Sequence, residues 1–251
     1  MHYSLNDLKK RHSVRSYTKE PIPLDIINKI KAEITMINTH ESGIKFCLCV
    51  NDNNPFKTFR QSYGFFANAN NYITCVIDPY YKYSYQRAGF FAQQIVMKVS
   101  SLGLGTCYVG GTYDKNAVSV DLKAGEKLLF IILLGFEDKT KIRPVARIAY
   151  TLIHSKKMSL SDFMPNLYDQ EAFFEKNPKL KDAIEAVSVS PSSLNKRPAR
   201  IKYDKGNVLM YVESNSDKSQ IDLGIAQFNF QAVYPGEWEW GNPSLFIPFD
   251  D

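Results

Sequence analysis

Two stretches of the chain place a glycine near the start of an apolar, helix-like segment, and this feature constrains the fold more than any other. One is Gln86-Arg87-Ala88-Gly89-Phe90-Phe91-Ala92 and the other is Gln220-Ile221-Asp222-Leu223-Gly224-Ile225-Ala226. A glycine inside a helix costs about 1 kcal/mol relative to alanine, so it usually marks the close approach of another backbone. We therefore expect the two helices to cross at Gly89 and Gly224, with a coincidental match as the alternative.

Capping residues, apolar periodicity and turn residues predict a chain of mixed helices and strands. Ser4 and Asp7 have the spacing of a capping box, and Asp204-Lys205-Gly206-Asn207 has the composition of a hairpin turn. Helices are expected at 4–10, from Pro23 through Ile34, from about Ser84 to Gly103, from Asn177 through Ile184 and around Ile221–Phe228. Strands are expected at 44–50, 72–77, 106–109, 128–134, 199–203 and 208–212, followed by an irregular arm at 234–251.

Composition restricts the classes of function. The chain has 251 residues, of which 44% are hydrophobic, so it can bury a sizeable core. Its 31 basic and 26 acidic residues give a net charge of +5 without a long basic run, so we do not expect a nucleic-acid partner. No apolar run reaches the roughly 18 residues that a membrane span needs, and the N-terminus is polar. We expect no membrane contact and a cytoplasmic location.

The cysteines and histidines do not form a metal-binding pattern. The four cysteines, Cys47, Cys49, Cys75 and Cys107, fall in apolar, strand-like runs, where we expect buried free thiols. Cys47 and Cys49 have no second Cys or His pair at zinc-ligand spacing, so no metal site is expected.

Two short polar segments resemble the flavin-phosphate segments of the nitroreductase family. Arg11-His12-Ser13-Val14-Arg15 is similar to the family pattern R-x-S-x-R, and Pro191-Ser192-Ser193-Leu194-Asn195 is similar to P-S-S-x-N. Enzymes of this family use FMN and either NADH or NADPH to reduce nitro groups, quinones and flavins. The resemblance therefore implies an FMN cofactor with NADH or NADPH as reductant, and a small-molecule substrate.

The resemblance also assigns expected roles. Arg11, His12 and Ser13 offer cations and N–H donors to the phosphate, and Arg15 would lie by the N1/C2=O edge of the ring. Pro191, Ser192, Ser193 and Asn195 would contact the ring surroundings and the ribityl chain. In the third matching segment, Gly110 would present its N–H to flavin N5, with Tyr108, Val109 and Gly111 beside it. A solvated basic patch and an ordinary helix stop are the alternatives for the first and third segments.

A late basic residue also binds the phosphate in this family, and Lys156 is the best match. Lys157, Arg143 and Arg147 compete for that role. The family usually continues N-x-Q-P-W, whereas here Arg197 and Ala199 replace the Gln and the Trp. This departure leaves the substrate preference open. We expect the flavin to carry the redox step, without a catalytic acid–base pair.

The positions of the two segments suggest how the chain is built. Arg11 and Pro191 are 180 positions apart, whereas in the family the P-S-S-x-N segment follows R-x-S-x-R after one helix. Residues 1–162 keep only the first segment and residues 163–251 only the second. The chain thus resembles a single-chain subfamily in which two nitroreductase-like halves are fused as a pseudo-dimer. This implies an α+β, three-layer α-β-α nitroreductase-like fold with two half-repeats, and a monomer with one flavin.

The expected function is ping-pong hydride transfer by an FMN-dependent NAD(P)H oxidoreductase acting on nitroaromatic, quinone or related acceptors. Two alternatives remain: a flavin-binding protein with little turnover, and a structural or interaction protein without flavin.

Overall fold

The computed structural model describes residues 3–57, 64–140, 158–167 and 169–249. By the density of its contacts the chain divides into two compact units, which are described separately. One comprises Met1–Lys10, Tyr85–Gln94 and His154–Asp251, and the other comprises Arg11–Ser84 and Ile95–Ile153. We call the first the terminal unit and the second the central unit. The predicted halves, 1–162 and 163–251, remain a prediction.

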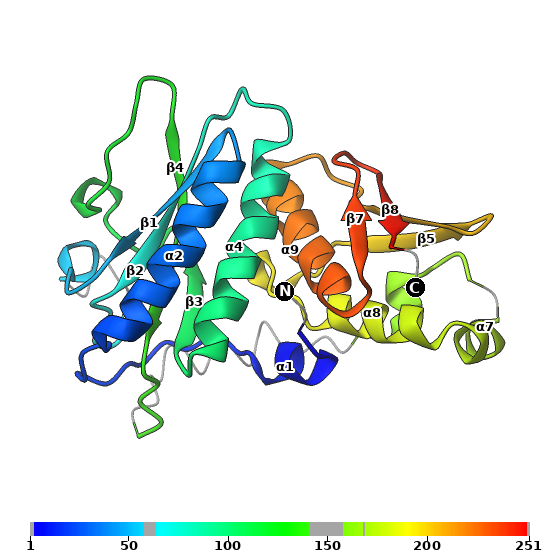
Figure 1. Cartoon of the computed structure of the whole chain (residues 1–251), viewed down its shortest axis with the longest axis horizontal. Coiled ribbons are helices and arrows are strands. Elements are labelled where there is room, and N and C mark those ends of the chain that lie inside the picture. Colours follow the sequence, from blue (N-terminus) through cyan, green and yellow to red (C-terminus); the bar gives the residue numbers. More distant parts are fainter. Residues whose placement is uncertain (1–2, 58–63, 141–157, 168, 250–251) are drawn as a thin grey trace. The chain divides into compact units, whose positions relative to one another are not determined.

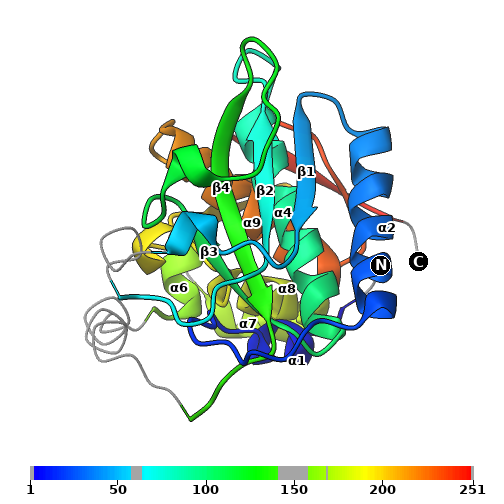
Figure 2. The same ribbon diagram turned by 90° about the vertical axis from the view of Figure 1, so that its left-hand side faces the viewer.

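The central unit is built on a four-stranded antiparallel sheet (Figure 2). Its strands are β1 (Ile44–Cys49), β2 (Tyr72–Ile77), β3 (Gly105–Val109) and β4 (Lys127–Gly135), in the order β1-β2-β4-β3. Strand β2 is buried along its whole length, as its continuous apolar sequence predicts. Strand β3 lies at an edge of the sheet, so one of its sides is available to another segment.

Helix α2 (Leu24–His40) lies along the β1 side of this sheet (Figure 1). It buries Ile30, Ile34 and Ile37, which recur at the spacing of one helical face. The side chain of Asn38 fastens the helix to the strand: its Nδ2 donates to the Phe46 carbonyl at 2.8 Å and its Oδ1 accepts from the Phe46 N–H at 2.9 Å. The carboxamide thus satisfies both backbone groups of one strand residue.

The terminal unit contains a second four-stranded antiparallel sheet. Its strands are β5 (Arg200–Asp204), β6 (Asn207–Tyr211), β7 (Gly236–Trp238) and β8 (Ser244–Pro248), in the order β5-β6-β8-β7. The β5–β6 hairpin turns where predicted, with positive φ at Lys205 (49°) and Gly206 (88°). Two successive left-handed residues are characteristic of the tight turn that matches the twist of paired strands.

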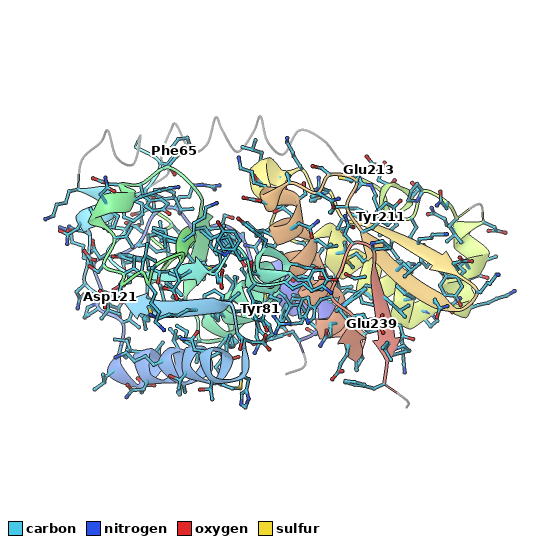
Figure 3. All side chains as sticks on the ribbon, turned by 90° about the horizontal axis from the view of Figure 1, so that it is seen from above. Phe65, Tyr81, Asp121, Tyr211, Glu213 and Glu239 are labelled. Atoms are coloured by element: carbon cyan, nitrogen blue, oxygen red, sulfur yellow. The ribbon has the colours of Figure 1, made fainter. Side chains whose placement is uncertain are left out.

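The prediction of an irregular arm at 234–251 is wrong. Strands β7 and β8 in this region pair with each other, and β8 also pairs with β6. The rings of Trp238 and Phe246 pack on Phe230, with centroids 5.2 and 4.9 Å away. In Figure 3, Tyr211 lies at the end of β6 and Glu239 directly after β7. The strands are short and separated by Pro and Gly residues, so their pairing depends on tertiary aromatic contacts that no local pattern displays.

The helices of the terminal unit lie in regions where helices were predicted, except the two short ones at 160–163 and 170–176, which were not predicted. They are α1 (Leu5–Lys10), α6 (Leu160–Phe163), α7 (Gln170–Lys176), α8 (Pro178–Ser188), α9 (Asp217–Val233) and the Tyr85–Gln94 part of α4 (Ser84–Ser101). The Ser4–Asp7 capping box is present, with the Asp7 N–H donating to Ser4 Oγ at 3.2 Å. Asn177 precedes α8, but its side chain donates to the Phe173 carbonyl at 2.9 Å instead of capping α8.

Helices α4 and α9 cross at their glycines, which confirms the prediction from the two similar stretches. A Cβ atom at Gly89 would overlap the carbonyl oxygen of Ile221, and one at Gly224 would overlap the carbonyl oxygen of Gln86. Buried amide pairs also join the two helices: Gln86 Nε2 donates to Gln227 Oε1 at 2.8 Å, and Gln93 Nε2 donates to Asn229 Oδ1 at 2.9 Å. Glycine is required here because backbone is in contact with backbone.

The four cysteines are free thiols. Cys75 and Cys107 are buried as expected, but Cys47 and Cys49 are only half-buried, because β1 is an edge strand. Across the described parts of the chain, no group of three or more His, Cys, Asp and Glu side chains is placed to hold a metal ion. None of the helices formed by the described residues has the length and apolarity needed to cross a membrane.

We expect Gly224→Ala to destabilise the protein, because the added methyl group must push α4 and α9 apart. Overpacking of this kind costs about 1–3 kcal/mol, whereas the gain in helix propensity is at most about 1 kcal/mol. A shift of the urea unfolding midpoint measures the difference. Gly111→Ala is the matched control, since a Cβ atom there would meet nothing within 4 Å. Equal midpoints for the two variants would contradict the close crossing.

Candidate functional site

The Arg11–Arg15 segment lies against the free edge of strand β3 in the central unit. Ser13 forms a parallel bridge with Thr106, and the Val14 N–H donates to the Thr106 carbonyl at 2.8 Å. A Cβ atom at Gly105 would overlap the Val14 side chain, so this glycine makes room for the segment. The extended conformation predicted after α1 is therefore stabilised by pairing with the sheet edge.

The two arginines of this segment are cations without a carboxylate partner among the described residues. Burial lowers the pKa of the Arg11 guanidinium, and Tyr108 and Cys107 oppose that shift. Arg15 Nη1 lies 3.5 Å from the Ser13 carbonyl oxygen, which is a weak contact at most. A desolvated cation that lacks an anion is unfavourable by itself, so this arrangement suits an anionic ligand.

The two residues between these arginines have different surroundings. The Ser13 side chain hydrogen-bonds the buried Cys107 thiol, whose pKa is raised by burial and lowered by Arg15, Arg11 and this bond. His12 Nε2 lies 2.9 Å from Glu137 Oε1, and 62% of the His12 side chain is exposed. The imidazole is therefore engaged with a carboxylate at the surface.

The end of β3 combines a packed strand with an open turn. Tyr108 is half-buried and its ring meets Phe130 edge-on, with centroids 5.5 Å apart. Val109 is 2% exposed and belongs to the core, where it pairs with Ile131 of β4, so it supports the strand from within. Gly110 and Gly111 are exposed, and a Cβ atom at either position would meet nothing within 4 Å. Their backbone therefore borders open space that a flat ligand can approach.

The Pro191–Asn195 segment forms a strained turn in the terminal unit, and η3 (Ser193–Asn195) is part of it. Leu194, Asn195 and Arg197 all have positive φ, at 52°, 53° and 46°. Such a conformation costs roughly 1–2 kcal/mol for a residue with a side chain, least for Asn. Leu194 is also 65% exposed, so apolar burial does not compensate its strain. Strain of this kind is frequent at binding sites.

Hydrogen bonds within the turn maintain this conformation. The Arg197 N–H donates to Ser192 Oγ at 2.8 Å, and the Asn195 N–H donates to the Ser192 carbonyl at 3.0 Å. Arg200 Nη1 donates to the Arg197 carbonyl at 2.8 Å. Arg197 Nη1 lies 3.4 Å from the Ser188 carbonyl, so this arginine is directed at the backbone of the preceding segment. Ala199 is buried, with 3% exposed.

Asp222 of helix α9 is a residue of this site that the sequence analysis did not identify. Its Oδ1 and Oδ2 accept from the Ser193 N–H at 3.0 and 3.2 Å. Burial raises the pKa of the carboxyl to about 7, against the Ser193 hydrogen bond and the charges of Lys196 and Lys218, which lower it. The available signal was an acidic residue between Ile221 and Leu223, two positions before Gly224, since a carboxylate is seldom fully buried unless it is paired.

The structure thus groups the predicted site residues within each unit. In the central unit they are Arg11, His12, Ser13, Arg15, Tyr108, Val109, Gly110 and Gly111, and in the terminal unit Pro191, Ser192, Ser193 and Asn195. Lys156, together with Lys157, Arg143 and Arg147, lies outside the described residues.

Comparison with known proteins identifies related families and structures. Residues 5–233 match the model of a family described as "Putative TM nitroreductase". A "putative nitroreductase" from Thermotoga maritima has a similar structure, with a TM-score of 0.62, 18% identity and coverage of 99% of this chain and 95% of that one. The predicted α+β, nitroreductase-like fold is thereby confirmed.

Two further solved structures are more distantly similar. An FMN-dependent nitroreductase from Clostridium difficile has a TM-score of 0.42, 23% identity and coverage of 55% of this chain and 89% of that one. A nitroreductase with bound FMN from Bacteroides fragilis has a TM-score of 0.43, 18% identity and coverage of 57% and 92%. Among curated proteins, none matches the chain significantly.

Proposed function

The chain belongs to the nitroreductase family, and we propose on that premise that it is an FMN-dependent NAD(P)H oxidoreductase. Its acceptors would be nitroaromatic compounds, quinones or related small molecules, and hydride transfer would follow a ping-pong order. The observation that carries the proposal is Arg11, a desolvated cation at the edge of β3 that no carboxylate neutralises within the described residues. A phosphate would supply the missing charge.

Further features within each of the two units fit FMN. The open backbone at Gly110 and Gly111 leaves space for a flat ring system, as the family resemblance requires of these positions. Arg15, on the same extended segment as Ser13, is a second cation without a carboxylate partner in the described structure. The Ser192–Asn195 turn offers hydroxyl, amide and backbone groups in a conformation that the chain maintains against strain.

Bound FMN would supply the chemistry of accepting and donating hydride. The chain's own residues would bind and tune it. Arg11 and Ser13 would hold the phosphate, and the Gly110 backbone would approach the ring. A cation such as Arg15 near the ring would favour the negatively charged reduced form and so raise the reduction potential.

The purified protein tests this function directly. We expect it to be yellow, or to bind added FMN, and to bleach when NADH or NADPH is added without oxygen. Addition of a quinone or nitroaromatic acceptor should then restore the colour. Failure to bind FMN would contradict the proposal, whereas bound flavin that neither nicotinamide reduces would identify a flavin-binding protein with little turnover.

We expect Arg11→Ala and Ser13→Ala to weaken FMN binding. Loss of a charge-assisted contact costs about 1.5–3 kcal/mol, or roughly a ten- to hundredfold weaker affinity for Arg11→Ala. The melting temperature of the flavin-free Arg11→Ala protein should be unchanged or higher, because a desolvated cation has been removed. Flavin fluorescence titration and thermal unfolding measure the two quantities. Lys19→Ala, which removes an exposed cation after the same segment, is the control. Equal FMN affinities for Arg11→Ala and Lys19→Ala would exclude the phosphate role.

We further propose that one chain holds one flavin and acts as a monomeric pseudo-dimer. The sequence supports this, because each of the two flavin segments occurs once and each lies near a different end of the chain. A domain-swapped homodimer is the rival arrangement, in which one chain supplies Arg11 and its partner supplies Asn195. Both arrangements contain one flavin per chain, so stoichiometry alone does not separate them.

Mixing two defective variants separates the arrangements. We expect an equimolar mixture of Arg11→Ala and Asn195→Ala chains, refolded together, to bind FMN no better than either variant alone. In a swapped dimer, a mixed pair would contain one intact site and regain binding. Fluorescence titration of the mixture, with refolded wild-type chain as control, measures this. Recovered affinity in the mixture would overturn the single-chain site.

A further inference from the structure

Asp222 joins the strained turn at Ser193 to the place where helices α4 and α9 cross. It follows Ile221, whose carbonyl oxygen faces Gly89 of α4, and it precedes Gly224, whose Cα faces the Gln86 carbonyl. The backbone on both sides of Asp222 is therefore fixed by direct backbone contact. A carboxylate at this position is held in place, with 6% of the residue exposed.

The turn needs such a fixed anchor. Leu194, Asn195 and Arg197 adopt left-handed conformations that they would leave if released, and Leu194 gains nothing from burial because its side chain is exposed. The bonds from Arg197 and Asn195 to Ser192 join parts of the turn to each other. The pair of contacts from the Ser193 N–H to Asp222 instead joins the turn to helix α9.

We propose that Asp222 is a positioning residue: its carboxylate holds the Ser192–Asn195 turn in the shape that binds flavin, and its ionised form tightens that binding. The flavin part of this inference rests on the proposed function. The anchoring part rests only on the geometry of Asp222 and Ser193.

The protonation state of Asp222 decides how strongly the turn is held. An ionised carboxylate accepts a charge-assisted hydrogen bond, about twice as strong as a bond to a neutral acid. Burial raises the pKa of Asp222 to about 7, and the charges that act on it within the described residues are those of Lys196 on the turn and Lys218 on its own helix. Helix α4 presents the uncharged Gly89 at this point, and its cation Arg87 lies over the Trp240 ring, 5.0 Å from the centroid.

The anchor can be observed without flavin. The amide resonance of Ser193 in the flavin-free wild-type protein, followed by NMR between pH 5.5 and 8.5, should titrate with a midpoint near 7. In Asp222→Asn the amide oxygen keeps an acceptor in place but does not ionise, so the Ser193 resonance should lose this titration. Asp182→Asn makes the same charge change on the exposed surface of α8 and should titrate as wild type does.

FMN affinity supplies the functional readout. Between pH 8 and pH 6, the FMN affinity of the wild type should fall about fivefold more than the FMN affinity of Asp222→Asn. Protonation of the FMN phosphate affects both proteins equally, so it cancels in this comparison. Asp222→Leu, which has no acceptor, should bind weakly at every pH, and Asp222→Asn should restore most of the affinity at pH 6.

The outcomes distinguish this inference from the proposed function. A Ser193 amide resonance that titrates in wild type but not in Asp222→Asn supports the anchor, whether or not FMN binds. If FMN does not bind, only the proposed function fails. A Ser193 resonance that does not titrate would overturn the role of the ionised form, and this measurement needs no variant to fold. FMN binding with the same pH dependence in wild type and Asp222→Asn would overturn the role in flavin binding.

Discussion

The backbone contact between α4 and α9 at Gly89 and Gly224 is the constraint on which the terminal unit depends. Two helices this close exclude every side chain at the crossing, so neighbouring positions are fixed within narrow limits. Gln86 uses that proximity to donate to Gln227, and it also lies 3.1 Å from the Gly241 carbonyl and 2.8 Å from Ser244 Oγ. One buried carboxamide therefore links the crossing to the start of β8. Asp222 extends the same constraint to the Ser192–Asn195 turn.

The parts of the fold that the sequence predicted correctly are those whose cause is local. The Ser4–Asp7 capping box, the apolar face of α2 and the turn at Lys205-Gly206 each require only neighbouring residues. The glycine crossing was predictable because a helix interior disfavours glycine unless backbone approaches it. Strands β7 and β8 were missed because they are short and show no clear period, and the packing of their rings on Phe230 of α9 is a tertiary contact that neither strand's own pattern reveals. The half-burial of Cys47 and Cys49 was missed because it depends on β1 being an edge strand, which a strand's own residues do not reveal.

The sequence predicted most residues of the candidate site, but not the contacts that hold them in place. Polar groups at Arg11–Arg15 and Pro191–Asn195 stand out in the sequence, whereas the pairing of Ser13 with Thr106 and the bond from Ser193 to Asp222 join residues distant in the chain. Both segments lie outside the regular strands and depend on a distant element for their shape. Each anchor fixes the backbone of its segment before any ligand arrives, which is the form of preorganisation that binding requires.

The burial of Arg11 and Asp222 in their charged forms lowers the stability of the folded protein. Burial opposes the charged form of both, lowering the pKa of Arg11 and raising that of Asp222. For Asp222 the unfolded chain loses its proton near pH 3.8 but the folded chain keeps it up to about pH 7. The folded state therefore binds more protons in that window, and the stability contributed by this group falls as the pH rises through it. The same rise in pH ionises the carboxylate and strengthens its bond to Ser193. Stability and anchoring thus respond oppositely to one proton, as expected where a buried charge is retained for binding and not for folding.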